Sequence, residues 1–118
     1  MPITRGFHDF LLDQLAELGD LTAKSMFGGL GLYHGDTFFG IVIDDVAYFK
    51  VDDANRRDYE REGMRPFKPY PDRPMTMRYY EVPLSVIEDS EELVRWARKA
   101  IAVAEVGASG RKRRPSRR

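Results

Sequence analysis

The chain has 118 residues, of which 42% are hydrophobic and 12% aromatic, and this composition fits one globular domain and excludes a wholly disordered protein. It contains no cysteine, which excludes disulfide frameworks, cysteine-based zinc sites and thiol catalysis. The net charge is zero, but the last eight residues hold six of the 19 Lys and Arg residues and no acid, so an acidic body precedes a basic tail.

The sequence predicts no segment that spans or enters a membrane. Met1-Pro2-Ile3-Thr4 is not followed by the basic and apolar regions of a signal peptide. The longest strongly apolar run, residues 38–43, is far too short to span a bilayer. We therefore expect a cytoplasmic protein without membrane contacts, which also fits the lack of cysteine.

The first predicted element is an amphipathic helix over residues 5–18. Thr4 is its predicted N-cap, and Gly19 is the residue expected to follow it. Its apolar residues recur at helical spacing and define one buried side: Phe7, Phe10, Leu11, Leu15 and Leu18.

A run of short strands follows. Gly28-Gly29 is expected to break or bulge the chain between the first two strands, and Asp44-Asp45 to form a tight turn. Residues 37–43 are apolar on both faces, which predicts a central strand. Short strands with short polar connections indicate an antiparallel meander, here over residues 23–27, 30–34, 37–43 and 46–51.

The next part of the chain mixes helices and strands. Asp52 or Asp53 is expected to cap a helix whose only sizeable apolar residue is Tyr59, so this helix should cover a sheet edge at the surface. Four elements are predicted here: helix 54–62, an edge strand at 64–68, a strand at 75–82 and a helical turn at 83–87.

The final predicted helix begins at the N-cap Ser90 and ends at Gly107. Residues 107–118 lack a large apolar side chain, so we expect a folded domain at residues 1–106 and a disordered basic tail at 107–118. The expected buried stripe of the helix consists of Leu93, Trp96, Ala97, Ala100, Ile101 and Ala104.

No catalytic or metal-binding constellation is visible in the sequence. His8 is expected on the polar side of the first helix and His34 in a turn, without a serine or metal-ligand partner at a recognised spacing. The acids Asp44-Asp45 and Asp52-Asp53 are explained by a turn and a cap, because neighbouring strand residues face opposite sides. We therefore expect no catalytic residue, no metal and no cofactor.

Two segments are candidates for binding. The glycines at 28–31 do not match a phosphate loop, since they precede a strand instead of a helix, although Lys24 beside them is either an anion contact or a solvated lysine. In the strand at 75–82, Met75, Met77 and Tyr79 share a face expected to be core, and Thr76, Arg78 and Tyr80 share a face that suits a protein partner if exposed. The candidate interaction surface comprises Lys24, Phe27, Gly28, Gly29, Arg78 and Tyr80.

The basic tail suits weak contact with a polyanion. Its six charges neutralise about six phosphates at most, which predicts non-specific and salt-sensitive binding to nucleic acid. The alternative is a tail that only aids solubility. The residues concerned are Arg111, Lys112, Arg113, Arg114, Arg117 and Arg118.

Four segments together resemble the TfoX (Sxy) N-terminal-domain family, which is named for a regulator of bacterial competence. They are KSMFGGLGLY at 24–33, AYFKVD at 47–52, PMTMRYYEVP at 74–83 and LVRWARKA at 93–100. The joint pattern covers roughly residues 10–106, and it is the combination that is specific.

The resemblance implies an α+β fold with an antiparallel sheet in the order α-β(3)-α-β(2)-α, similar to secretion-chaperone-like domains. It also implies a domain without established enzymatic activity, found in regulators of transcription that act through other proteins. The competence regulators carry a second, C-terminal domain where this chain has a basic tail, so we expect a stand-alone domain.

Three hypotheses about function follow. The first is a non-enzymatic regulatory or adaptor module that binds a protein, with a second copy of this chain as one option. The second is a nucleic-acid-binding accessory protein that uses the basic tail. The third is a small enzyme using Lys24, His34 or Tyr80, which requires a deep pocket that joins two of them.

Overall fold

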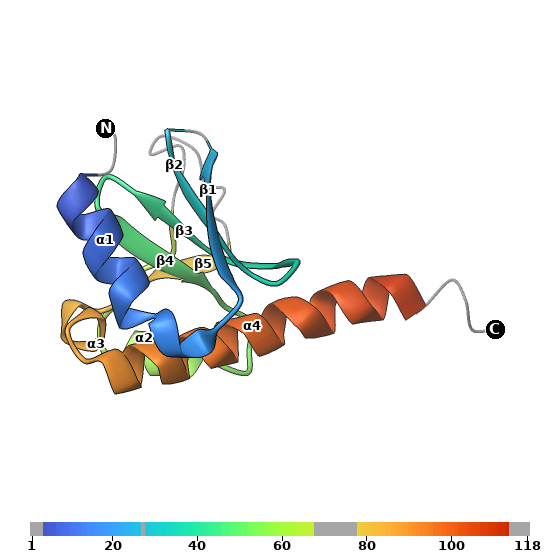
Figure 1. Cartoon of the computed structure of the whole chain (residues 1–118). Helices are drawn as coiled ribbons and strands as arrows, with labels where there is room; N and C mark the ends of the chain where they lie inside the picture. Colours follow the sequence, from blue (N-terminus) through green and yellow to red (C-terminus); the bar gives the residue numbers. More distant parts are fainter. Residues whose placement is uncertain (1–3, 27, 68–77, 114–118) are drawn as a thin grey trace.

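A five-stranded antiparallel sheet with helices on one face forms the domain, which confirms the α+β class (Figure 1). The computed structural model describes residues 4–26, 28–67 and 78–113, the last seven of these by their backbone only. The strands are β1 (Leu21–Met26), β2 (Gly29–His34), β3 (Thr37–Ile43), β4 (Val46–Lys50) and β5 (Tyr79–Glu81). The helices are α1 (Arg5–Gln14), α2 (Arg56–Arg61), α3 (Leu84–Ile87) and α4 (Ser90–Arg113), with a 3₁₀ turn η1 at Ala16–Leu18.

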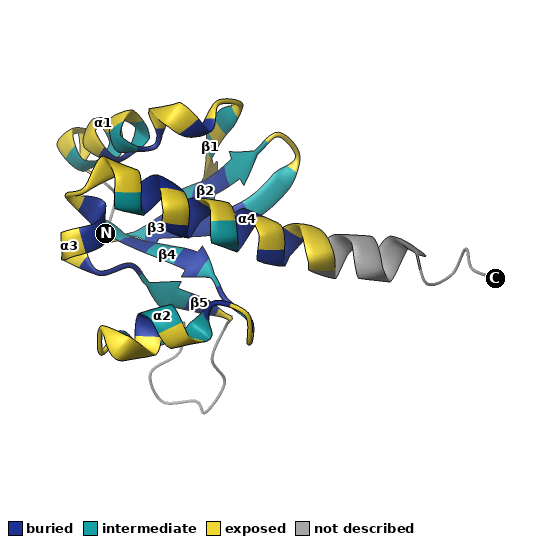
Figure 2. Cartoon of the chain, turned by 90° about the horizontal axis from the view of Figure 1, so that it is seen from below, coloured by how far each residue is buried: buried dark blue, intermediate teal, exposed yellow. Residues whose placement is uncertain are grey.

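The sheet runs in chain order from β1 at one side to β5 at the other, as Figure 2 shows behind α4. This is the predicted meander, and β3 is its central strand. Four strands precede α2 and one follows it, whereas the resemblance implied three and two. The expected edge strand at 64–68 is reduced to a bridge between Pro66 and Tyr80, and Met75, Thr76 and Met77 lie outside the described residues.

Helix α1 is tied to the sheet at its first turn. The Thr4 hydroxyl accepts a hydrogen bond from the Phe7 N–H at 3.2 Å, which confirms the N-cap. The Thr4 N–H and hydroxyl also donate to the Asp45 carboxylate at 2.8 and 2.9 Å. The helix ends at Gln14 and continues as η1, so the predicted single helix to Leu18 is too long, and Phe10 is exposed instead of buried.

Gly28 lies in the hairpin turn between β1 and β2, so the predicted break between these strands is confirmed and the alternative, a bulge at Gly28-Gly29, is wrong. Gly28 has a φ of +76° in the two-residue connection between β1 and β2, and residue 27 lies outside the described residues. Gly29 is already in β2, where an added Cβ would collide with the Val42 carbonyl oxygen. The bulge lies further along, where the pairing of β2 with β3 shifts between Leu32 and Tyr33.

The turn between β3 and β4 is the predicted Asp44-Asp45 pair. Both residues have left-handed backbone angles, with φ values of +55° and +62°, as the tightest hairpin turns require. Aspartate tolerates this conformation better than most residues. The turn therefore fixes the carboxylate of Asp45 beside the start of α1.

Helix α4 lies across the sheet and contributes more buried residues to the core than any other element. Every residue of its predicted stripe is buried. The cap is Asp89 instead of Ser90, because the Asp89 carboxylate accepts the Glu92 N–H at 3.2 Å. The helix continues through Gly107 to Arg113, so its predicted end at Gly107 is wrong, and residues 107–113 of the expected disordered tail are helical. One glycine costs a helix only about 1 kcal/mol relative to alanine, which the flanking helix formers offset.

Replacing Thr4 with alanine should destabilise the domain by about 1–2 kcal/mol, because the substitution removes the helix cap and the contact to Asp45. Urea unfolding monitored by Trp96 fluorescence measures the change. Ser85→Ala is the control, since Ser85 is exposed and its side chain forms no hydrogen bond among the described residues. An equal loss of unfolding free energy in both variants would contradict the stabilising role of the Thr4 cap and of its contact to Asp45.

Candidate interaction surfaces

The residues of the expected interaction surface fall at two separate places. Lys24, Gly28 and Gly29 lie in the hairpin of β1 and β2, whereas Arg78 and Tyr80 lie in and next to β5. Strands β1 and β5 are the two outer strands of the sheet, so β3 and β4 lie between the two groups (Figure 2). Phe27 lies outside the described residues. Each group must therefore be assessed as a surface of its own.

Arg78 and Tyr80 line a cleft of about 390 Å³, which we call the α2–β5 cleft. Tyr80 pairs with Phe49 in the sheet, so its ring faces the helix-covered side and packs 5.8 Å from the Tyr59 ring, half-buried. Arg78 is exposed, and its carbonyl oxygen accepts the Val51 N–H at 2.8 Å. The other lining residues are Val51, Asp52, Asp53 and Arg56.

A buried amide next to this cleft fixes the backbone of the lining residue Asp52. Asn55, only 2% exposed, accepts the Asp52 N–H at 2.9 Å through Oδ1 and donates through Nδ2 to the Lys50 carbonyl oxygen at 3.1 Å. The Asp52 carboxylate accepts the Ala54 N–H at 2.7 Å in the turn before the helix. Helix α2 begins only at Arg56, with Asn55 at the N-cap position and no side-chain cap, so the predicted cap by Asp52 or Asp53 and the predicted helix bounds of 54–62 are wrong. Sequence reasoning missed Asn55 because an asparagine before a helix has several explanations, and only its burial decides among them.

The two arginines of the cleft differ in whether an acidic side chain pairs with them. Arg56 Nη1 lies 2.6 Å from Asp53 Oδ1, and this hydrogen bond raises the pKa of Arg56 above its ordinary value. Arg56 Nε also lies 3.5 Å from Glu60. Arg78, in contrast, forms no ion pair with any residue that the structure describes. Among the described residues, Arg78 is therefore the cation of the cleft without an ion pair.

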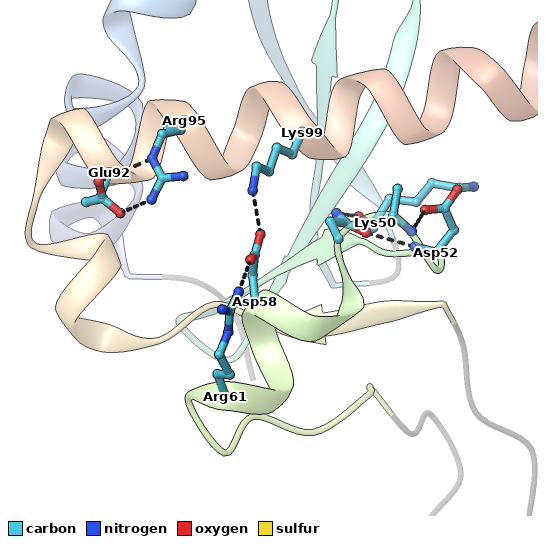
Figure 3. A network of polar contacts seen from close by, with 9 residues as sticks. Lys50, Asp52, Asp58, Arg61, Glu92, Arg95 and Lys99 are labelled. Atoms are coloured by element: carbon cyan, nitrogen blue, oxygen red, sulfur yellow. Dashed lines mark hydrogen bonds and ion pairs between the residues drawn. The ribbon is translucent and has the colours of Figure 1, made fainter.

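Behind the cleft, a polar contact ties α2 to α4 (Figure 3). The Asp58 carboxylate receives hydrogen bonds from Lys99 at 2.7 Å and Arg61 at 2.8 Å. Burial tends to raise the pKa of Asp58, but the hydrogen bonds and charges of Lys99 and Arg61 outweigh it, so this pKa lies below its ordinary value. The position of α2, and with it Arg56, depends on this contact.

The lowered pKa of Asp58 predicts how the stability of the domain depends on pH. Because the pKa of Asp58 is lower in the folded state, its contribution is fully present above the unfolded value of about 3.9 and is lost as the pH falls through the folded value. Asp58→Asn should therefore lose about 1–2 kcal/mol at pH 7 and progressively less as the pH is lowered into the range where the folded carboxylate is protonated. Urea unfolding across this pH range measures the difference, with exposed Asp13→Asn as the control. A pH-independent difference would contradict the argument.

The second place is a groove of about 510 Å³ between the start of α1 and the β1–β2 hairpin, which we call the α1–β1 groove. In the groove wall His8 Nδ1 lies 2.9 Å from the Asp9 carboxylate, and Arg5 Nε lies 4.0 Å from it. The full lining is Arg5, His8, Asp9, Ser25, Gly28, Gly29 and Leu30. The sequence did not predict that His8 and the glycine turn line one groove, because this depends on how α1 docks on the sheet.

The described residues offer little support for catalysis. Ser25 and His8 share the α1–β1 groove, but no hydrogen bond joins them as a nucleophile and base require. Lys24 Nζ lies 4.9 Å over the Tyr33 ring, and neither the α1–β1 groove nor the α2–β5 cleft joins any two of Lys24, His34 and Tyr80. Across the described part of the chain, no group of three or more His, Asp or Glu could hold a metal ion.

No helix within the described ranges is long and apolar enough to cross a membrane.

A comparison with family models matches the TfoX N-terminal domain over residues 13–104. The chain belongs to the TfoX N-terminal domain family. The match includes the whole sheet and the α2–β5 cleft, and it begins after the α1 residues that line the α1–β1 groove. The family is not a known enzyme family. None of the curated proteins compared with this TfoX N-terminal domain matched it.

Proposed function

We propose that this TfoX N-terminal domain is a non-enzymatic regulatory or adaptor module that acts by binding another protein. The observation that carries the proposal is the α2–β5 cleft. There, Arg78 is exposed and has no ion pair among the described residues, and it lies beside the half-buried ring of Tyr80. Arginine and tyrosine are the side chains most enriched at the energetic centres of protein interfaces.

The chemistry of the cleft indicates what the partner presents. A carboxylate from the partner satisfies the Arg78 guanidinium, and an apolar or aromatic side chain covers the Tyr80 ring. The compensated pair of Asp53 and Arg56 forms a polar rim, which contributes orientation more than affinity. This combination of a central anchor and a satisfied rim is the usual anatomy of a transient interface.

The proposal extends to regulation of transcription in the cytoplasm. The resemblance to competence regulators, which act through other proteins, supports the regulatory part. The lack of cysteine in the sequence agrees with a reducing compartment. In this reading, the domain changes the activity of its partner by occupying a surface, without chemistry of its own.

Reversing the charge of Arg78 should abolish partner binding. We expect a cross-linked pull-down from the source lysate to recover a set of proteins with the wild type, and Arg78→Glu to reduce their recovery at least about tenfold. Tyr80→Ala should do the same. Quantitative mass spectrometry gives the measurement.

Arg98→Glu is the matched control, because Arg98 is an exposed arginine of α4 outside the cleft. Recovery of the same proteins in equal amounts with all four chains would show that the cleft is not the binding surface. A wild type that recovers no protein and remains a free monomer would count against the protein-binding role as a whole.

The alternative function is binding of nucleic acid through the basic tail. Helix α4 extends beyond the sheet in Figure 1, and its backbone stays helical to Arg113. This arrangement supports a polyanion contact by Arg111, Lys112, Arg113, Arg114, Arg117 and Arg118 at a distance from the acidic body.

This alternative predicts a steep dependence on salt. Binding to a labelled DNA duplex is measured by fluorescence anisotropy at several salt concentrations. The logarithm of the association constant should fall with the logarithm of the salt concentration, with a slope no steeper than about −5, because six cations neutralise at most six phosphates. Replacing all six with alanine in the full chain should abolish binding. Binding that persists in this variant would place the contact elsewhere, and no binding at low salt would remove the alternative.

A further inference from the structure

The sheet has one covered edge and one open edge. At β5, the chain at residues 65–67 pairs along the outer side: the Phe67 N–H donates to the Tyr79 carbonyl oxygen at 2.6 Å, and the Glu81 N–H donates to Arg65 at 3.1 Å. Strand β1 has no such neighbour among the described residues and is paired with β2 alone. An open edge is a template for a further strand.

The backbone groups that face outward from β1 can be identified. The Gly35 N–H donates to the Asp20 carbonyl oxygen at 2.9 Å, which continues the ladder of β1 and β2 by one more pair. Hydrogen-bonded positions alternate along an antiparallel ladder, so the even-numbered residues of β1 bond to β2. Leu21, Ala23 and Ser25 therefore direct their N–H and C=O groups to the open side.

The α1–β1 groove lies beside this edge and adds a place for side chains. Ser25 and its partner Leu30 face the helix-covered side of the sheet, and both line the groove with Arg5 and His8 of α1. A strand added along β1 has alternate side chains on this same side, where they enter the groove. Backbone pairing and a side-chain groove together are what recognition of an extended peptide requires.

The charges at the edge select the chemistry of the added strand. Arg5, with its side chain 92% exposed, lies on the groove side, and exposed Lys24 lies on the opposite face of the sheet. Asp9 lies 2.9 Å from His8 and 4.0 Å from Arg5 Nε, so a carboxylate of the added strand competes at Arg5 only with a long ion pair between exposed side chains, which is weak. Glu17 and Asp20 precede the other end of β1. Consecutive side chains of an added strand alternate between the two faces, so adjacent acids would meet Arg5 and Lys24 in turn.

We infer that β1 binds an extended acidic segment of a partner protein as an additional strand, with its acidic end beside Ser25 and Met26. The inference rests on the proposed protein-binding role but uses the opposite edge of the sheet from the α2–β5 cleft. The chain's own basic tail is excluded as the occupant by its charge, since it would meet Arg5 and Lys24. A segment of opposite charge is attracted to both faces of the edge.

Selection from a random library of twelve-residue peptides, displayed on phage against the immobilised full chain, tests the inference. We expect enriched peptides to combine β-forming residues with adjacent acids. Hydrogen exchange of the complex with the most enriched peptide should slow at Leu21, Ala23 and Ser25, because their amides gain partners. Enrichment of no peptide, or slowed exchange only at β5 and α2, would overturn it.

Two substitutions separate backbone pairing from charge. Ala23→Pro removes an outward N–H at an edge position where proline is tolerated, and should weaken binding of the enriched peptide about tenfold. Arg5→Glu should weaken it by a similar factor without touching the sheet. Arg98→Glu is the control and should bind like the wild type. Thermal unfolding verifies that Ala23→Pro is folded. If Ala23→Pro does not fold, the binding measured for Arg5→Glu alone decides the test.

The outcomes also distinguish other occupants. Binding unchanged in both Ala23→Pro and Arg5→Glu would overturn the inference. Wild-type chain that sediments as a dimer, and Ala23→Pro that sediments as a monomer, would assign the edge to a second copy of the chain instead. Because Arg78 lies at the other edge, a failed Arg78→Glu pull-down leaves this test unaffected, and the reverse also holds.

Discussion

The packing of α4 across the sheet is the constraint on which the rest of the structure depends. Ala97 and Ala100 are fully buried, so the helix can lie close to the strands, while Leu93, Trp96 and Ile101 fill the space at its flanks. The other helices are held either by α4 itself or by α3, which packs against α4. Helix α2 is held by Asp58 and Lys99, and α1 is held to α3 by a hydrogen bond from Gln14 to the Ile87 carbonyl oxygen. Loss of this packing would displace the helices that form the α2–β5 cleft and the α1–β1 groove.

This arrangement makes the two edges of the sheet independent. The α2–β5 cleft is positioned through α2, Asn55 and Asp58, whereas the α1–β1 groove is positioned through α1, Thr4 and Asp45. No polar contact links the two sets directly among the described residues. A module with two separate surfaces on a rigid sheet can hold two partners at a fixed spacing, which is what an adaptor requires.

The periodicity of the sequence predicted most of the elements and little of the site. Strands β2, β3 and β4, the buried stripe of α4 and the Asp44-Asp45 turn follow from local patterns that the tertiary structure reinforces. The errors at the start of α2, at Ser90 and at Gly107 concern boundaries, where one hydrogen bond or one backbone angle decides. The groove, the Lys99 contact and the role of Asn55 depend on residues distant in sequence, which no local pattern encodes.

The length of α4 bears on the opposite charges of the acidic body and the basic end of the sequence. Ala104 is the last residue of the buried stripe, and the helix continues to Arg113, so at about 1.5 Å per residue its end stands about 14 Å further on. At physiological ionic strength, the field of an exposed charge fades over about 8 Å. The helix therefore separates the end of its buried stripe from residue 113 by more than the distance over which such a field fades.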